Sequence, residues 1–256
     1  MGKTIVIANQ KGGVGKTTTA INMAGGIAEK MHSVLLVDVD PQSNATSGIG
    51  LGKENSGKSV YECLIGEKQA KDSITVSSTE WLDVLPSDIN LIGAEIELVS
   101  MFSRETKLRD VLTPVKDSYD YILIDCPPSL GLLTVNALVA SDAILIPMQC
   151  EYYAMEGLTQ LLKTIHLVRQ ALNPGLELEG VVLTMYDSRL RLDEQVIKEI
   201  RKCFGDKVYK TVIPRNVRLA EAPSYGKTIF QYDRSSKGAE SYGKLVEEFC
   251  QRNGYK

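Results

Sequence analysis

The sequence predicts a single α/β domain, spanning residues 1–256, in which a mostly parallel sheet is covered by helices on both faces. Two observations lead to this fold class. Short, continuous apolar runs alternate along the whole chain with segments of helical periodicity, the pattern of parallel strands joined by crossover helices. The 43% hydrophobic content allows a sizeable core, and neither a linker nor a change of composition divides the chain.

The first strand and helix of this alternation are joined by a glycine-rich loop. An apolar run begins at about Lys3, and a helix is expected from Thr17 to about Lys30. Glycines without a Cβ let backbone N–H groups close around phosphate oxygens, at a helix N-terminus whose dipole attracts anions. In such a P-loop, Lys16 reaches the β- and γ-phosphates and the Thr17 hydroxyl binds Mg²⁺. We therefore predict a nucleotide site formed by Gln10, Lys11, Gly12, Gly13, Val14, Gly15, Lys16, Thr17 and Thr18.

Two later apolar runs end in carboxylates. Residues 33–38 end in Asp38, with Asp40 two positions further on, and residues 121–125 end in Asp125. Ligands bind at the carboxyl ends of strands in open α/β sheets, so these acids are expected at the same edge as the glycine-rich loop. The second run has the form of a Walker B strand, whose acid holds Mg²⁺ through water. The sequence therefore predicts a magnesium site that includes Thr17 and Asp125.

The remaining elements continue the alternation. A strand is expected at residues 82–85, and a long helix from Asp88 to about Lys116 carries apolar residues at Ile92, Ile96 and Val99. We further predict a turn-rich loop at 41–50, a loop tip at 53–58, a short helix at 61–65, helices at 131–140, 151–172, 190–204 and 237–250, and strands at 143–147, 178–183 and 208–213.

Charge is unevenly distributed along the chain. The net charge of −3 argues against a generic nucleic-acid-binding protein. Residues 185–230, however, hold ten Lys or Arg against six Asp or Glu, so this segment carries +4 and the remainder carries −7. The segment is either an anion-facing surface or a set of solvated helical faces.

Cysteine and histidine usage indicates no metal centre. The five cysteines include no C-x-x-C pair, and two histidines cannot supply a ligand cluster, so we expect reduced thiols and no zinc. No secretory segment and no apolar run of about 20 residues occurs. Val6 stands where a myristoylation signal has Ser or Thr. We expect a cytoplasmic protein without a membrane partner.

Several motifs resemble one family of ATPases. Residues 11–18 (Lys-Gly-Gly-Val-Gly-Lys-Thr-Thr) carry a lysine before the glycine pair, and Gln10 stands where the general P-loop has glycine. This loop resembles the deviant Walker A loop of the ParA/MinD superfamily. Residues 38–46, 125–130, 150–157 and 212–224 look like those of the Soj/ParA chromosome-partitioning ATPases, so the resemblance spans nearly the whole chain.

The resemblance implies a function for the whole molecule. It predicts a protein that forms a homodimer in Mg-ATP, binds double-stranded DNA without sequence preference, associates with the nucleoid, and hydrolyses ATP slowly until a ParB/Spo0J-type partner stimulates it. Because the first strand begins at about Lys3, we expect the short type without an N-terminal helix-turn-helix. Whether the cellular role is segregation, replication control or both stays open.

The resemblance also assigns roles to individual positions. Lys11 would reach the partner subunit's nucleotide, and Gly12 would permit the close approach of the two subunits. Lys16 would hold phosphate, and Asp40 would orient the attacking water. The resemblance also implies Mg²⁺ binding for Thr17, Asp38 and Asp125, adenine contacts for Met185, Pro214 and Asn216, and DNA contacts for Arg189, Arg218 and Lys227. Two alternatives stay open: Asp38 has a structural role, and the three basic residues are ordinary solvated side chains.

Three other functions compete with this interpretation. A MinD-type membrane ATPase requires a C-terminal amphipathic helix, but residues 242–256 contain adjacent glutamates and few basic residues, which favours a helix packed on the domain. A redox ATPase requires cluster-binding cysteines, and for Cys126 and Cys150 we favour packed, neutral thiols. A nucleotide-gated scaffold with incidental hydrolysis uses the same residues and stays open.

Overall fold

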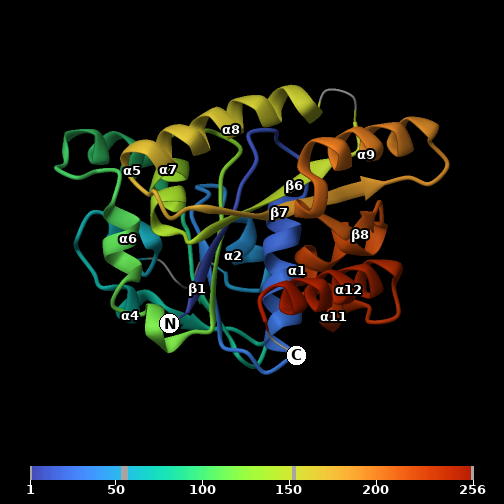
Figure 1. Ribbon diagram of the computed structural model, residues 1–256. Coiled ribbons are helices and arrows are strands. Elements are labelled where there is room, and N and C mark those ends of the chain that lie inside the picture. Colours follow the sequence, from blue (N-terminus) through green and yellow to red (C-terminus); the bar gives the residue numbers. More distant parts are fainter. Residues whose placement is uncertain (1, 53–56, 152–153, 255–256) are drawn as a thin grey trace.

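A computed structural model describes residues 2–52, 57–151 and 154–254 of the chain (Figure 1). Its centre is one eight-stranded sheet in the order β3-β4-β2-β5-β1-β6-β7-β8. Neighbouring strands are parallel throughout, except for the antiparallel pair β3 and β4. The strands are β1 (Lys3–Ile7), β2 (Val34–Asp38), β3 (Thr75–Val76), β4 (Leu82–Leu85), β5 (Tyr121–Asp125), β6 (Ala143–Gln149), β7 (Glu177–Tyr186) and β8 (Val208–Pro214).

Helices connect these strands and cover both faces of the sheet, which confirms the predicted fold class. The α-helices are α1 (Lys16–Ala28), α2 (Asn44–Gly48), α3 (Val60–Leu64), α4 (Ala70–Ser73), α5 (Leu91–Glu97), α6 (Lys107–Leu112), α7 (Leu132–Ala140), α8 (Ala154–Ala171), α9 (Arg191–Phe204), α10 (Val217–Glu221), α11 (Ile229–Tyr232) and α12 (Lys237–Arg252). Short 3₁₀ turns are η2 (Leu98–Ser100), η3 (Lys116–Ser118), η4 (Gly205–Lys207) and η5 (Ala222–Tyr225).

Alternating residues of each strand contribute to two separate hydrophobic cores. Ile5 and Ile7 of β1 face the core that α1 and α12 close, whereas Val6 faces the core of α7 and α8. In Figure 1, α8 and α12 lie on opposite sides of strands β6 and β7. Because both faces are covered, the central strands read as continuous apolar runs in the sequence, which explains why they were predictable.

The long helix predicted from Asp88 to Lys116 is wrong, because this segment forms α5, η2 and α6 separated by turns. Asn136 of α7 causes part of the break: its side chain accepts a hydrogen bond from the Leu108 backbone N–H at 3.1 Å and donates one to the Arg104 carbonyl at 2.8 Å. These contacts replace bonds that a continuous helix would make. The apolar residues of this segment therefore differ in burial: Leu108 is buried, whereas Ile92, Ile96 and Val99 are exposed.

Other elements differ from the sequence prediction at the sheet edges and in short turns. The turn-rich loop at 41–50 contains α2, and the elements α4, β3, α10 and α11 were not predicted. Strands β6 and β7 continue to Gln149 and Tyr186, beyond the predicted ends at 147 and 183. Residues 53–56 of the predicted loop tip and residues 152–153 of the predicted helix at 151–172 lie outside the described residues.

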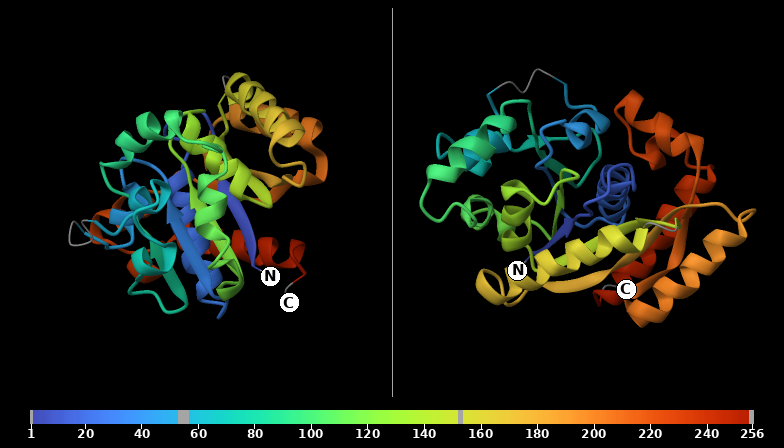
Figure 2. Two further views of the ribbon diagram at one scale, coloured as in Figure 1. Left: turned by 90° about the vertical axis from the view of Figure 1, so that its left-hand side faces the viewer. Right: turned by 90° about the horizontal axis from the view of Figure 1, so that it is seen from above.

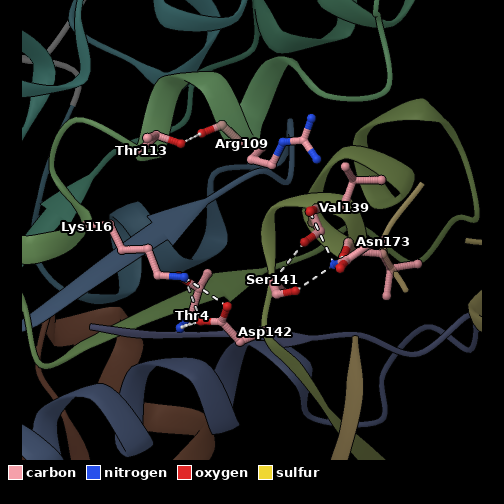
Figure 3. A network of polar contacts seen from close by, with 10 residues as sticks. Thr4, Arg109, Thr113, Lys116, Val139, Ser141, Asp142 and Asn173 are labelled. Atoms are coloured by element: carbon pink, nitrogen blue, oxygen red, sulfur yellow. Dashed lines mark hydrogen bonds and ion pairs between the residues drawn. The ribbon is translucent and has the colours of Figure 1, made fainter. Parts of the chain in front are cut away.

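Polar side chains fasten the amino ends of the strands (Figure 3). Lys116 forms an ion pair of 2.7 Å with Asp142, and the same carboxylate accepts a hydrogen bond from the Thr4 backbone N–H at 2.8 Å. Asn173 donates to the Ser141 carbonyl at 2.7 Å and to the carbonyls of Leu138 and Val139 near the end of α7. These contacts satisfy backbone groups that the helix end leaves unpaired. They hold the edge of the sheet opposite the P-loop.

Helix α12 is a packed element of the domain, as its sequence predicts. Its apolar residues Tyr242, Leu245 and Phe249 are buried against α1 and the sheet, and the Tyr242 hydroxyl lies 3.1 Å from the Thr19 hydroxyl. Figure 2 shows α12, in red, lying along the lower part of the sheet. Since its apolar face is already buried, this helix does not offer the free amphipathic surface that a membrane-binding helix requires. Over the described residues, no helix has the length and apolar character needed to cross a membrane.

Candidate nucleotide-binding site

The glycine-rich loop connects β1 to α1 at the carboxyl edge of the sheet. Gly13 and Gly15 have φ of 72° and 84°, left-handed values that favour glycine, and Gly15 is the residue that precedes the first turn of α1. The predicted loop geometry is therefore present. Lys16 is buried, and its Nζ donates to the Lys11 carbonyl at 3.1 Å. Burial lowers the pKa of Lys16, and the nearby charges of Asp125 and Asp40 oppose this shift.

The strand register brings two carboxylates to the loop. Strand β5 lies between β1 and β2, so Asp125 is the register partner of both Ile7 and Asp38. The Asp125 carboxylate is fully buried, and neither oxygen makes a hydrogen bond of regular geometry within the described residues, although the Thr17 hydroxyl lies close enough to interact with it. Burial, and then the charge of Asp38, raise the pKa of Asp125 well above its usual value, while the neighbouring Thr17 hydroxyl opposes the shift.

This unpaired carboxylate is suited to a cation. Buried carboxylate oxygens without partners are costly, and a divalent ion next to them would remove that cost. Mg²⁺ is held in nucleotide sites by one or two carboxylates, by phosphates and by water, so a single acid beside a P-loop threonine fits that ion. The residues present therefore fit Mg²⁺, with Asp125 and Thr17 in the positions that the sequence predicted.

Asp38 makes a different set of contacts. One of its oxygens accepts hydrogen bonds from the backbone N–H and the hydroxyl of Thr46, each at 2.8 Å, and the other accepts from the Asp40 backbone N–H at 3.0 Å. Burial raises the pKa of Asp38 to about 6, against these hydrogen bonds. Because both oxygens are engaged, Asp38 organises the loop that carries Asp40. This geometry favours a structural role for Asp38. Direct binding of Mg²⁺ by Asp38 stays a prediction.

Asp40 lies at the start of the loop that joins β2 to α2. Its Oδ1 accepts from the Gln42 backbone N–H at 2.9 Å, and its carbonyl accepts from the Ser87 hydroxyl at 2.7 Å. The residue is 6% exposed. The loop therefore holds the Asp40 backbone in place, and among the described residues no hydrogen bond to its second carboxylate oxygen is found.

The residues before the glycines extend toward α8 and the strand-to-helix loop that precedes it. Lys11 Nζ lies 2.5 Å from Glu151 Oε2, and Gln10 Nε2 donates to Gln160 of α8 at 2.7 Å. Gly12 is exposed, and a Cβ added there would meet no atom of the described chain closer than 3.9 Å. The part of the chain that the structure describes therefore leaves the space next to Gly12 open.

A cavity of about 200 Å³ lies between α1 and the ends of β7 and β8. It is lined by all three residues predicted to contact adenine, Met185, Pro214 and Asn216, together with Gly15 and Thr18 of the P-loop segment. The cavity is mostly apolar, and the Asn216 side chain accepts from the Arg218 backbone N–H at 2.9 Å at the start of α10. The structure thus brings the predicted adenine contacts to one place beside the phosphate loop.

Sequence reasoning missed several residues of this site. Ile213, Leu219 and Tyr242 also line the cavity, and Gln149 and Thr184 hold carbonyls of the P-loop. Tyr242 lies on α12, far along the chain, and no local signal indicated its place. Thr184 and Gln149 end neighbouring strands, a position that only the sheet register reveals.

The residues predicted to contact DNA come after the carboxyl ends of β7 and β8. They differ in whether a carboxylate of the same chain pairs with them. Arg189 is 85% exposed, and its guanidinium donates to both oxygens of Asp187 at 2.8 and 2.6 Å. This pairing lowers the pKa of Asp187 to about 2. Arg218 pairs with Glu221 at 2.8 Å, and Lys227 is exposed, with no ion pair found for it in the described part of the chain.

Comparison with known proteins identifies the family. A family model described as an AAA domain matches residues 2–178. The chain is 58% identical to the sporulation initiation inhibitor protein Soj of Bacillus subtilis, over 97% of this chain and 98% of Soj. It is 52% identical to the chromosome partitioning protein ParA of Myxococcus xanthus, over 99% and 89% of the two chains. The chain belongs to the Soj/ParA family of chromosome-partitioning ATPases.

Solved structures support the same fold for this Soj/ParA protein. Cobyrinic acid a,c-diamide synthase from Mycobacterium smegmatis, in a structure with bound ADP and magnesium, superposes with a TM-score of 0.84 at 35% identity, covering 96% of this chain and 93% of that one. The nucleotide and the ion are properties of that protein's structure. The match shows that such a ligand pair is bound on a closely similar backbone.

The two cysteines considered as cluster ligands, Cys126 and Cys150, are packed in this Soj/ParA protein, as the sequence predicted. Cys126 and Cys150 are both buried. Burial, and then the charge of Asp125, raise the pKa of the Cys126 thiol well above its usual value, and burial raises the pKa of Cys150 to about 12. Both thiols are therefore neutral at physiological pH and poor ligands for a metal cluster.

Proposed function

We propose that this Soj/ParA protein is a Mg-ATP-dependent switch that dimerises in ATP and then binds double-stranded DNA without sequence preference. A ParB/Spo0J-type partner would stimulate its slow hydrolysis, and the protein would act in the cytoplasm on the nucleoid. The observation that carries the nucleotide part of the proposal is the buried, unpaired Asp125 carboxylate beside Lys16 and Thr17. Family membership supports the role in chromosome partitioning.

Four groups of this chain divide the work of ATP hydrolysis. The loop N–H groups and Lys16 hold the phosphates, and the cavity beside Met185 and Pro214 takes the base. Magnesium, held by Thr17 and Asp125, would neutralise charge on the phosphate oxygens. Asp40 orients the attacking water with its second carboxylate oxygen.

The dimer would form across the P-loop edge of the sheet. The open space above Gly12 permits a second backbone to approach, since no described residue fills it. Lys11 is free to leave its own chain at little cost, because its pair with Glu151 joins two partly exposed side chains and such pairs contribute about 0–1 kcal/mol. A partner's phosphate oxygens offer Lys11 a stronger acceptor than a single exposed carboxylate.

The DNA surface would be the basic segment at residues 185–230. Arg189 and Arg218 follow neighbouring strands, and the Arg215 backbone N–H donates to the Tyr186 carbonyl at 3.1 Å, which joins the two loops. In one monomer, Arg189 and Arg218 are each paired with a carboxylate of the same segment, Asp187 and Glu221. Two copies in one dimer would double the basic surface, and affinity for phosphates falls with log salt at a slope of about −0.9 per phosphate neutralised.

A salt titration with paired variants tests the DNA surface. Affinity for two unrelated duplexes is measured in ATP, in an Asp40→Ala background that retains the dimer. We expect Arg189→Ala to weaken binding to both duplexes and to flatten the salt slope. Asp187→Asn should strengthen binding at low salt, because it removes the charge that pairs with the Arg189 guanidinium. The amide oxygen of the new side chain can still accept the hydrogen bond from the Arg189 backbone N–H.

The matched control is Arg234→Ala. Arg234 is also an exposed arginine paired with a carboxylate, Glu29, but Glu29 lies at the end of α1 that is remote from the P-loop. We expect this variant to bind DNA as the parent does. Equal losses in Arg189→Ala and Arg234→Ala would show a general effect of net charge, and an unchanged Arg189→Ala titration would place the DNA surface elsewhere.

A further inference from the structure

Two side chains from neighbouring strands hold the outside of the phosphate loop. A loop whose N–H groups face phosphate turns some of its carbonyls away from the ligand, and these carbonyls need other partners. The Thr184 hydroxyl at the end of β7 donates to the Val14 carbonyl at 2.8 Å. Gln149 Nε2 at the end of β6 donates to the Gly13 carbonyl at 3.0 Å. The two residues are register partners, so they act on the loop side by side.

Gln149 has a second contact that reaches into the cavity beside the loop. The same amide nitrogen lies 2.8 Å from the sulfur of Met185. An amide NH₂ has two hydrogens and can donate to two acceptors, here one in the phosphate loop and one in the cavity wall. Gln149 is 9% exposed, so water competes little for either contact.

Met185 is itself held in an uncommon backbone conformation. Its φ is 54°, a left-handed value that costs free energy for a residue with a Cβ and that persists only when the surroundings fix it. Met185 lines the cavity that we assign to adenine. A base entering that cavity would press on a side chain whose sulfur is tied, through one amide group, to the Gly13 carbonyl.

We propose that Gln149 is a positioning residue that couples occupancy of the base cavity to the geometry of the phosphate loop. The proposal rests on the assignment of the cavity to adenine. With a base against Met185, the amide of Gln149 stays between sulfur and carbonyl and holds Gly13 in its left-handed conformation. Without a base, the Met185 side chain lacks support on its cavity side, so its sulfur anchors the amide less firmly and the loop is in turn held less firmly.

The test compares ATP with inorganic tripolyphosphate, which has the phosphates but no base. Both affinities are measured in Mg²⁺ by competition against a fluorescent ATP analogue, for the parent and for Gln149→Leu, Thr184→Val and Met185→Leu. Thr184→Val is the matched control, because it removes one loop hydrogen bond but does not touch the bond to the Met185 sulfur. Thr184 also lines the cavity, and valine keeps the side-chain shape there. Gln149→Met is a second variant at the same position.

We expect Thr184→Val to weaken ATP and tripolyphosphate by similar factors, about tenfold for one buried carbonyl left unpaired. Gln149→Leu and Gln149→Met should weaken ATP by a larger factor than tripolyphosphate. In a Met185→Leu background, the additional loss for ATP should disappear, because the contact that transmits it is already absent.

Three results would overturn the proposal. Equal losses of ATP and tripolyphosphate in both Gln149 variants would show that Gln149 only supports the loop. Additive effects of Gln149→Leu and Met185→Leu would show that the sulfur contact transmits nothing. Equal affinities of the parent protein for ATP and tripolyphosphate would show that the cavity does not bind adenine, and the coupling would fall with that assignment. This last result is seen in the parent, so it is distinguishable from a failure of the role of Gln149, which is seen only in the variants.

Discussion

Replacing Asp125 by asparagine should stabilise the nucleotide-free protein and abolish Mg-ATP binding. The carboxylate is fully buried, makes no hydrogen bond of regular geometry among the described residues, and lies next to Asp38 on the neighbouring strand. Its raised pKa means that the folded state holds the proton more tightly than the unfolded state does. The free energy of unfolding therefore falls as pH rises from the unfolded pKa near 3.8 toward the folded pKa.

The size of the effect follows from linkage. One pKa unit corresponds to about 1.4 kcal/mol, so the stability cost of Asp125 grows by about that amount for each pH unit within this window. Asparagine has no charge to bury, so the variant does not carry this cost. The variant should match the parent near pH 4 and exceed its stability increasingly toward pH 6.

Urea unfolding at several pH values between 4 and 7, with EDTA and without nucleotide, measures this difference. Repeating the series with Mg-ATP should reverse the order, because only the parent gains free energy from the ligand. The conservative control is Asp83→Asn, which changes an acid of the same sheet outside the site. Parallel stability curves for the parent and Asp125→Asn would refute the account of Asp125 as an unpaired buried carboxylate.

Three further predictions test separate parts of the molecule. Lys11→Ala should leave nucleotide affinity nearly unchanged, because Lys16 binds the Lys11 carbonyl, but should prevent the ATP-dependent dimer in sedimentation; a normal dimer would show that Lys11 has no role between subunits. Asp40→Ala should retain ATP binding and the dimer while slowing turnover strongly, and wild-type phosphate release would assign the water to another group. Asn173→Ala should lower the free energy of unfolding by about 2 kcal/mol in urea, because the two amide hydrogens shared among three carbonyls are lost; a change below about 0.5 kcal/mol would mean that water replaces them.

The central strands and the phosphate loop were predictable because their signals are local. A strand covered on both faces must be apolar at every position, and the loop requires glycine where φ is positive, as at Gly13 and Gly15. Asp38 and Asp125 could be placed at one edge because parallel strands end together. Which of the two has unpaired oxygens could not be predicted, since that depends on Thr46 in the following helix α2.

The errors and omissions arise from contacts between distant segments. The long helix predicted from Asp88 fails because Asn136, 28 residues beyond Leu108, takes over its backbone bonds. The cavity forms only because β8 and α12 reach the P-loop, which no local pattern predicts. Only the family resemblance indicated that Met185, Pro214 and Asn216 contact adenine. Gln149 had no signal at all, because a glutamine at the end of an apolar run is also an ordinary strand end.

In the proposed function, ATP gates the binding of DNA through a dimer. Sedimentation of the Asp40→Ala protein with a duplex of arbitrary sequence, in ATP and in ADP, measures this gate. We expect a dimer that carries DNA in ATP and a free monomer in ADP, with Lys11→Ala abolishing the ATP complex. Equal amounts of DNA sedimenting with the protein in ADP and in ATP would contradict it.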